Sequence, residues 1–125
     1  MSNASKKLAG LRILVAEDES MIALDLETML GRFGCQVIGP LSRVEDVIER
    51  ARAGAIDGAL LDVNLRGRQI FDVLPELTRL GLKIVLTSGY DDATLFPESY
   101  RTLPRVSKPF EEAVLRQACE AAFLP

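Results

Sequence analysis

Short apolar runs alternate with longer segments of helical periodicity along the whole chain. Five such runs predict strands, at residues 11–16, 36–39, 59–63, 83–88 and 105–107. Most of them are aliphatic or β-branched with few polar positions, which is typical of parallel strands covered on both faces. Between them, hydrophobic residues recur at every third or fourth position, the spacing of one helical face. The pattern predicts strand and helix in regular alternation.

The first two helices have clear signals at their ends. Residues 20–33 carry one apolar face that stops at Gly34, a residue suited to the left-handed conformation at a helix end. The second helix is expected to start at a capping box formed by Ser42 and Glu45, and to end near Gly54. Each of these helices follows directly after a predicted strand.

Proline complicates the later helices. The apolar spacing of residues 70–80 predicts a third helix, in which Pro75 lies either in a late-starting first turn or at a kink. Residues 91–101 form at best a short fourth helix, because Pro97 interrupts them. Residues 113–123 predict the fifth and last helix.

Five strand–helix units favour an α/β fold, with one doubly wound parallel sheet and five helices on its two faces. A chain of 125 residues is long enough for one such domain. We place this domain at residues 10–125 and expect residues 1–9 to be a disordered or cloning-derived N-terminal tail. In sheets of this type, ligands bind at the carboxyl ends of the strands.

Composition narrows the function classes. The formal net charge of -3 gives no basic field for direct binding of nucleic acid. No apolar run is long enough to span a membrane or to serve as a secretion signal, so we expect a cytoplasmic protein. The absence of histidine excludes histidine-based catalysis. Cys35 and Cys119 are far apart in sequence and are expected to be core residues.

Polar side chains follow or end four of the predicted strands. Glu17 and Asp18 come after the first strand, Asp62 lies near the end of the third, Ser88 closes the fourth and Lys108 follows the fifth. Because the carboxyl ends of parallel strands meet at one edge of the sheet, we expect these side chains to converge. The sequence therefore predicts a site with three carboxylates, one hydroxyl and one ammonium group.

This set of groups favours metal-assisted phosphoryl transfer. Clustered carboxylates repel one another unless a cation lies between them, and hard oxygen ligands suit Mg²⁺ or Mn²⁺. The expected metal ligands are Glu17, Asp18, Asp62 and the backbone carbonyl of Asn64. A carboxylate can attack phosphorus to form an aspartyl phosphate, and Asp62 is the candidate phosphoacceptor.

Three further residues are expected to hold the phosphoryl group once it is attached. Lys108 supplies a positive charge, Ser88 a hydroxyl group, and Gly89 allows a close approach of the backbone. Thr87 is an alternative source of the hydroxyl, although the glycine that follows Ser88 favours Ser88.

Four short motifs resemble the receiver domain of bacterial two-component response regulators, namely those at residues 13–18, 60–65, 87–89 and 108–110. The resemblance covers nearly the whole chain. It implies a flavodoxin-like sheet of strand order 2-1-3-4-5 and a signalling protein rather than a conventional enzyme. It also implies that the domain catalyses its own phosphorylation and dephosphorylation at Asp62.

The resemblance further implies the partners and the switch residues. The phosphoryl donor would be a sensor histidine kinase or a histidine phosphotransfer protein, and the output would be altered binding of a downstream protein target. A cis peptide bond is expected before Pro109. The position three residues before Lys108, often aromatic in the family, is Arg105 here, so Arg105 and Tyr90 are the candidate switch residues.

Some residues and functions keep a second interpretation. A small Mg²⁺-dependent phosphatase of the haloacid dehalogenase type would also use an aspartate nucleophile, but it needs an acid two residues further on, where this chain has Asn64. An interaction module that is never phosphorylated is the other alternative.

Arg66 and Arg68, which flank the acceptor loop, are expected to be solvated charges.

Overall fold

One parallel sheet forms the centre of the computed structural model, which describes residues 7–89 and 96–125. Its strands are β1 (Arg12–Ala16), β2 (Gln36–Leu41), β3 (Gly58–Asp62), β6 (Ile84–Ser88) and β7 (Arg105–Ser107). They are hydrogen-bonded in the order β2-β1-β3-β6-β7, and every neighbouring pair is parallel. This is the predicted order 2-1-3-4-5, counted over the strands of this sheet, and the α/β fold is confirmed.

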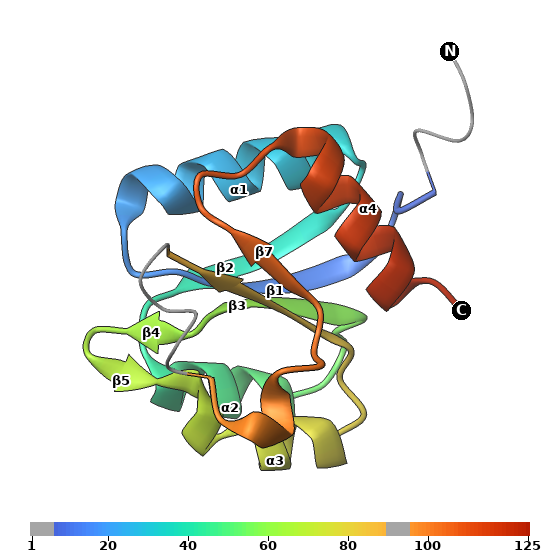
Figure 1. Ribbon diagram of the computed structural model, residues 1–125. Coiled ribbons are helices and arrows are strands. Elements are labelled where there is room, and N and C mark those ends of the chain that lie inside the picture. Colours follow the sequence, from blue (N-terminus) through green and yellow to red (C-terminus); the bar gives the residue numbers. More distant parts are fainter. Residues whose placement is uncertain (1–6, 90–95) are drawn as a thin grey trace.

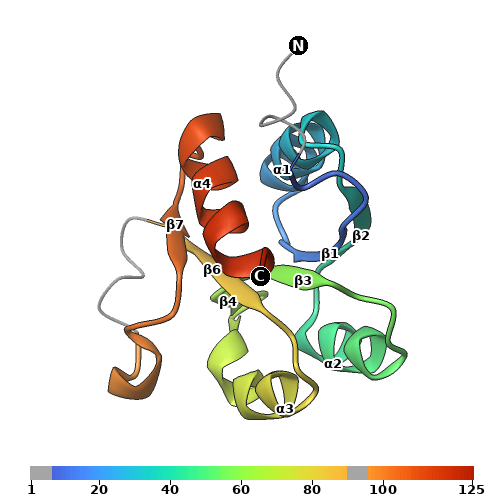
Figure 2. The same ribbon diagram turned by 90° about the vertical axis from the view of Figure 1, so that its right-hand side faces the viewer.

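Helices cover both faces of the sheet. They are α1 (Ser20–Arg32), α2 (Val44–Arg52), α3 (Leu74–Arg79) and α4 (Glu112–Phe123). Figure 1 shows α1 and α4 on one face and α2 and α3 on the other, and Figure 2 shows the same two layers after a quarter turn. Among the described residues, no helix has the length and apolar character needed to cross a membrane.

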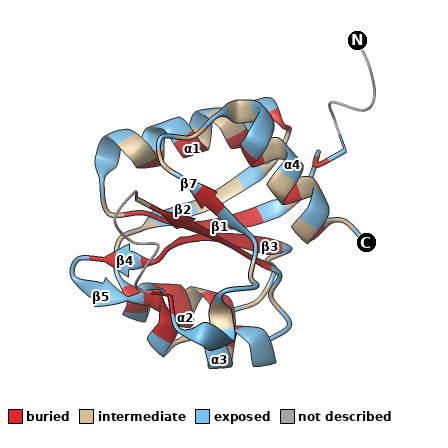
Figure 3. Ribbon diagram, in the orientation of Figure 1, coloured by how far each residue is buried: buried red, intermediate tan, exposed pale blue. Residues whose placement is uncertain are grey.

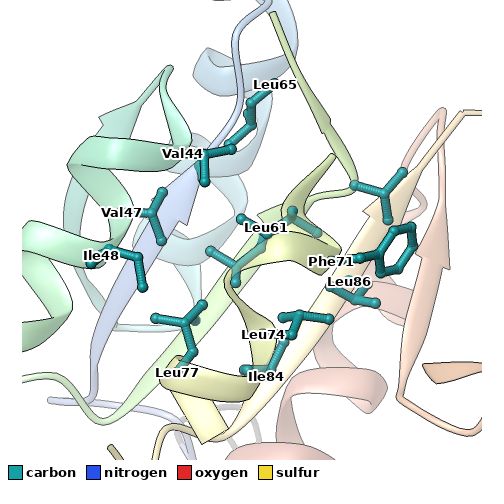
Figure 4. Packing of buried hydrophobic residues seen from close by; sticks show 14 of the residues in the cluster. Val44, Val47, Ile48, Leu61, Leu65, Phe71, Leu74, Leu77, Ile84 and Leu86 are labelled. Atoms are coloured by element: carbon teal, nitrogen blue, oxygen red, sulfur yellow. The ribbon is translucent and has the colours of Figure 1, made fainter. Parts of the chain in front are cut away.

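The alternation of side chains along each strand divides the hydrophobic core into two halves. Leu61 of β3 belongs to the cluster under α2 and α3, where it packs with Val47 and Leu77 (Figure 4). Its neighbour Leu60 points to the opposite face and packs in the cluster with Leu26 of α1. Since both faces of the central strands are buried (Figure 3), these strands are apolar except at their carboxyl ends.

The edge strand β2 is longer than predicted and runs to Leu41. Proline has no backbone N–H to donate. Pro40 is tolerated there because some N–H groups of an edge strand have no partner in the sheet. The register of β1 and β2 shifts at this point, and Gly39 has a φ of 108°. A Cβ atom on Gly39 would lie 2.7 Å from the carbonyl oxygen of Val15, so both the conformation and the space require glycine.

The third helix starts late, as one of the two interpretations of Pro75 predicts. A 3₁₀ turn, η2 (Ile70–Asp72), comes first, and Pro75 then lies in the first turn of α3. Proline suits this position because the backbone N–H groups of a first helical turn have no partner within the helix.

The predicted capping box of α2 is wrong. The helix begins after Arg43, and no side chain caps it. The carboxylate of Glu45 instead accepts a hydrogen bond of 2.7 Å from the guanidinium of Arg68, which comes from another part of the chain. A tertiary ion pair has therefore replaced the local cap, and the pattern of Ser42 and Glu45 could not reveal this.

The prediction of five helices is also wrong for the part of the chain that the structure describes. Between β6 and β7 this part holds only a 3₁₀ turn, η4 (Glu98–Tyr100), directly after Pro97. The Tyr100 ring stacks on Phe71 with centroids 5.7 Å apart, so packing of aromatic rings holds a turn too short to be an α-helix. Residues 90–95, including the candidate switch residue Tyr90, lie outside the described residues.

Part of the expected N-terminal tail packs against the domain. Leu8 is 1% exposed and belongs to the cluster between the sheet and helices α1 and α4. The N–H of Gly10 donates to the carbonyl of Gly34, which ties this segment to the end of α1. A single leucine among small and polar residues has no periodicity, so its burial was not visible in the sequence.

Candidate functional site

The carboxyl ends of three strands bring two acids and one base into contact. Asp62 ends β3, Glu17 directly follows β1, and Lys108 follows β7. The Lys108 Nζ atom lies 2.8 Å from Asp62 Oδ2 and 2.9 Å from Glu17 Oε1. Glu17 and Asp62 are 3% and 2% exposed, so both carboxylates are almost completely removed from water. The structure thus brings together three of the residues that the sequence singled out.

Asp18 completes an acidic cluster with the two buried carboxylates. One ligand oxygen from each of Glu17, Asp18 and Asp62 lies within 4.8 Å of the other two. Glu17 Oε1 is buried, and apart from Lys108 at 2.9 Å it has no polar partner among the described residues, so the oxygen keeps a lone pair for a further ligand. Three hard oxygen donors with one such unsatisfied oxygen fit a divalent cation of the Mg²⁺ type, so the cluster could bind a metal ion.

Burial dominates the electrostatics of the two inner carboxylates. It raises the pKa of Glu17 to about 7, although Lys108 and the N–H of Glu19 lower it, and the charge of Asp62 adds to the rise. Burial also raises the pKa of Asp62, against hydrogen bonds from Lys108 and the N–H of Asn64. Folding therefore disfavours the charged forms of these two carboxylates as long as no metal ion is bound.

Lys108 stays charged in this environment. Burial alone would lower its pKa, but hydrogen bonds and charge interactions with Asp62 and Glu17 outweigh burial and raise the pKa above its usual value. One ammonium faces three carboxylates, so the cluster retains a net negative charge that a divalent cation would neutralise.

Glu17→Gln is expected to stabilise the metal-free protein above pH 7. The folded-state pKa of Glu17, about 7, exceeds its usual value of 4.5, so ionisation favours the unfolded state. Wild-type stability should therefore fall as the pH rises from about 4.5 to 7, and the neutral amide avoids this loss. We expect a gain on the order of 1–3 kcal/mol at pH 8, from urea unfolding with a chelator present.

Glu19→Gln is the matched control, because Glu19 is a neighbouring acid with an exposed side chain. It makes the same change of charge and should leave the stability nearly unchanged. Equal stability of wild type and Glu17→Gln at pH 8, or a loss in the variant, would contradict the raised pKa.

The two candidate hydroxyl groups both lie at the end of β6. Thr87 pairs in register with Asp62, and its Oγ1 is buried without a hydrogen-bond partner in the described parts of the chain. Ser88 is 2% exposed, and its carbonyl accepts a hydrogen bond of 2.8 Å from the N–H of Lys108. Gly89 follows and is partly buried. The register thus places Thr87 beside Asp62, and Ser88 comes one residue later.

A short hairpin that the sequence did not predict follows the acceptor strand. It consists of β4 (Asn64–Leu65) and β5 (Arg68–Gln69), paired antiparallel. At its start, the N–H of Asn64 donates to Asp62 Oδ1 over 3.3 Å. Both oxygens of Asp62 are thus oriented, one by this N–H and the other by Lys108.

The turn of the hairpin fixes Asp18. The N–H of Arg66 donates a hydrogen bond of 2.8 Å to Asp18 Oδ2, across 48 residues of sequence. Arg66 and Gly67 have φ values of 51° and 83°, the positive values that a type I′ turn requires at both central positions. Sequence reasoning missed this contact, because arginine is unusual in such a turn and only Gly67 indicated one.

Comparison with known proteins decides the family. A family model described as the response regulator receiver domain matches residues 13–120. The chain belongs to this family. The transcriptional regulatory protein PdtaR of Mycobacterium tuberculosis, strains CDC 1551 / Oshkosh and H37Rv, is 29% identical over 114 residues, which are 89% of this chain and 56% of PdtaR. This receiver domain thus spans little more than half the length of these curated relatives.

Solved structures resemble this receiver domain over nearly its full length. The solution structure of SdrG from Sphingomonas melonis Fr1 has a TM-score of 0.81 and 32% identity, covering 90% of this chain and 95% of SdrG. The BeF3-activated conformation of SdrG from Pseudomonas melonis Fr1 has a TM-score of 0.78 and 32% identity, covering 90% and 96%. A receiver protein from Sinorhizobium medicae WSM419 has a TM-score of 0.71 and 28% identity, covering 92% and 95%.

Arg105 makes an aromatic contact in this receiver domain. Its guanidinium carbon lies 4.7 Å from the centre of the Phe96 ring, in the range of a cation–π interaction. Phe96 is buried and contacts Phe71 edge-on, with ring centres 5.1 Å apart. Arg105 therefore links β7 to a cluster of aromatic rings beside the site.

The peptide bond between Lys108 and Pro109 is cis, as expected.

Proposed function

We propose that this receiver domain accepts a phosphoryl group on Asp62 from the phosphohistidine of a sensor histidine kinase or a histidine phosphotransfer protein. The observation that carries the proposal is the geometry around Asp62. Its buried carboxylate accepts a hydrogen bond from Lys108, and ligand oxygens of Glu17 and Asp18 lie within 4.8 Å. This arrangement suits a phosphoacceptor, because it orients one carboxylate and surrounds it with groups for binding a cation.

The clustered carboxylates of Glu17, Asp18 and Asp62 would hold Mg²⁺ or Mn²⁺. The backbone carbonyl of Asn64 would be a fourth ligand. Such a cation, when bound, neutralises charge on the phosphoryl oxygens. Lys108 has the matching role on the protein side, and it is already beside Asp62. Donors from Ser88 and the backbone of Gly89 would hold the remaining phosphoryl oxygens.

The proposed reaction exchanges one bond to phosphorus for another. A carboxylate oxygen of Asp62 attacks the phosphorus atom, and the bond from phosphorus to the donor's histidine nitrogen breaks. The imidazole leaves and takes up a proton from solvent, and an acyl phosphate remains on Asp62. Hydrolysis of this acyl phosphate by water restores the carboxylate and releases inorganic phosphate. In both steps the domain supplies positioning and charge stabilisation.

The output of the switch is altered binding of a downstream protein. Lys108 and Ser88 lie next to β7, and Arg105 of that strand contacts the ring of Phe96. A new charge beside Lys108 changes the balance of ion pairs at this edge and biases the conformation of the adjoining surface.

We expect the protein to act in the cytoplasm, without direct contact to nucleic acid or membrane.

Incubation with Mg²⁺ and acetyl phosphate or beryllium fluoride tests the proposal. With acetyl phosphate, a receiver gains one phosphoryl group per chain, visible by intact-protein mass spectrometry. With beryllium fluoride it forms a non-covalent complex, visible by NMR, and a chelator prevents both. A phosphatase would instead release phosphate over many turnovers from simple phosphate esters, and an inert interaction module would do neither. The BeF3-activated structure of SdrG makes beryllium fluoride a suitable probe. Absence of any adduct would contradict the proposed function.

A further inference from the structure

Among the described residues that meet at Asp62, the positive charge of Lys108 is already paired when a phosphoryl donor arrives. A phosphoryl group carries negative charge and must approach Glu17, Asp18 and Asp62. Lys108 already forms ion pairs with two of these carboxylates. A further cation at the mouth of the site would lower the electrostatic barrier to approach.

Arg66 lies directly beside Asp18, one of these carboxylates. Its backbone N–H holds Asp18 Oδ2 at 2.8 Å, so the residue is fixed beside the acidic cluster. It is exposed, and it borders a surface hollow of about 450 Å³ whose wall also includes Glu17 and Asp18. The β4–β5 hairpin that carries it extends beyond the edge of the sheet in Figure 1.

The type I′ turn of the hairpin requires a positive φ at position 66, but it does not require an arginine there. With a φ of 51° Arg66 adopts a left-handed conformation in which asparagine and glycine are the favoured residues. Its side chain is exposed, and its guanidinium has no ion pair among the residues described here. Arg68, two residues further on, instead forms ion pairs with Glu45 and Asp72. Arg68 thus ties the hairpin to α2 and η2, whereas the guanidinium of Arg66 remains available for a ligand.

We propose that Arg66 binds the phosphoryl donor, its guanidinium holding two non-bridging oxygens of the phosphoryl group while Asp62 attacks. The inference rests on the proposed function and adds a donor-binding residue to it. With acetyl phosphate, the Asp62 carboxylate forms the new oxygen–phosphorus bond and acetate leaves with the electrons of the old one. Guanidinium groups suit this role, because their planar N–H groups match two phosphoryl oxygens at once.

Arg66→Asn separates the side chain from the backbone. Asparagine is favoured at this turn position and keeps the N–H that holds Asp18, so only the guanidinium is lost. Arg66→Lys retains the charge without the planar group. Arg79→Gln removes one exposed charge at the far end of α3, away from the strand ends, and serves as the matched control.

The rate constant for adduct formation is measured against acetyl phosphate concentration at saturating Mg²⁺, and Mg²⁺ affinity is measured separately by calorimetry. We expect Arg66→Asn to lower the second-order rate constant roughly three- to tenfold, as the loss of a solvent-exposed charge-assisted contact would. Arg66→Lys should recover part of the rate, and Arg79→Gln should match the wild type. The difference between wild type and Arg66→Asn should shrink at high ionic strength.

Three outcomes would overturn the proposal. Equal rates for wild type and Arg66→Asn would show that the guanidinium does not contact the donor. A parallel loss of Mg²⁺ affinity in Arg66→Asn would assign the effect to Asp18 instead. Absence of an adduct in the wild type would overturn the proposed function and this inference together, whereas normal adduct formation with equal rates overturns the inference alone.

Discussion

Asp62→Asn is expected to abolish the acyl phosphate completely. An amide oxygen is a poor nucleophile, and the substitution removes the carboxylate while keeping the size and position of the side chain. The neighbouring hydrogen-bond donors, Lys108 and the N–H of Asn64, remain in place. The variant is incubated with Mg²⁺ and acetyl phosphate, and intact-protein mass spectrometry should show no adduct under conditions that modify the wild type.

Asp46→Asn is the matched control for this experiment, since Asp46 is an exposed acid on α2. It makes the same chemical change and should form the adduct at the wild-type level. Circular dichroism should show that both variants keep the fold. An adduct of undiminished yield in Asp62→Asn would move the phosphoacceptor to another residue.

Lys108→Met is expected to destabilise the metal-free protein at pH 8 and to slow adduct formation. The buried carboxylates of Glu17 and Asp62 lose their ion-pair partner, which leaves uncompensated charge away from water. Removing one partner of a buried ion pair costs about 3–5 kcal/mol, and we expect the lower part of that range, because the carboxylates can take up protons. Loss of the positive charge should also slow adduct formation about tenfold or more.

The pH dependence distinguishes this effect from simple loss of packing. Lys108 lowers the pKa of Glu17 and of Asp62, so both values should rise further in the variant. Near pH 5 these carboxyl groups are then protonated in the folded protein, and the destabilisation should shrink. Lys83→Met, which removes a lysine directly before β6, is the control for the loss of one positive charge. A penalty that is equal at pH 5 and pH 8 would contradict this account.

The fold and the convergence of the site followed from simple patterns. Buried parallel strands such as 59–63 are apolar except at Asp62, and turn residues such as Gly34 mark helix ends, so the order of elements was visible in the sequence. Because the strands are parallel, the residues that follow their carboxyl ends lie together at one edge of the sheet. Asp62 and Lys108 are 46 positions apart, yet their contact required only that both follow the ends of parallel strands.

The features that the sequence did not reveal depend on contacts between distant segments. Glu45 forms an ion pair with Arg68 in place of a local cap. The N–H of Arg66 can donate to Asp18 only once the hairpin has formed. The burial of Leu8 likewise depends on a core contact that no periodicity marks. Local patterns describe helices and strands well, but they do not encode partners that tertiary structure selects.

The central claim is that folding turns one carboxylate, that of Asp62, into a phosphoryl acceptor. Borohydride reduction of the phosphorylated protein, followed by peptide mass spectrometry, tests it most directly, because reduction converts an aspartyl phosphate into homoserine. The account predicts homoserine at position 62 in the wild type and at no other acidic residue. Homoserine at a different aspartate, or none after adduct formation, would contradict it.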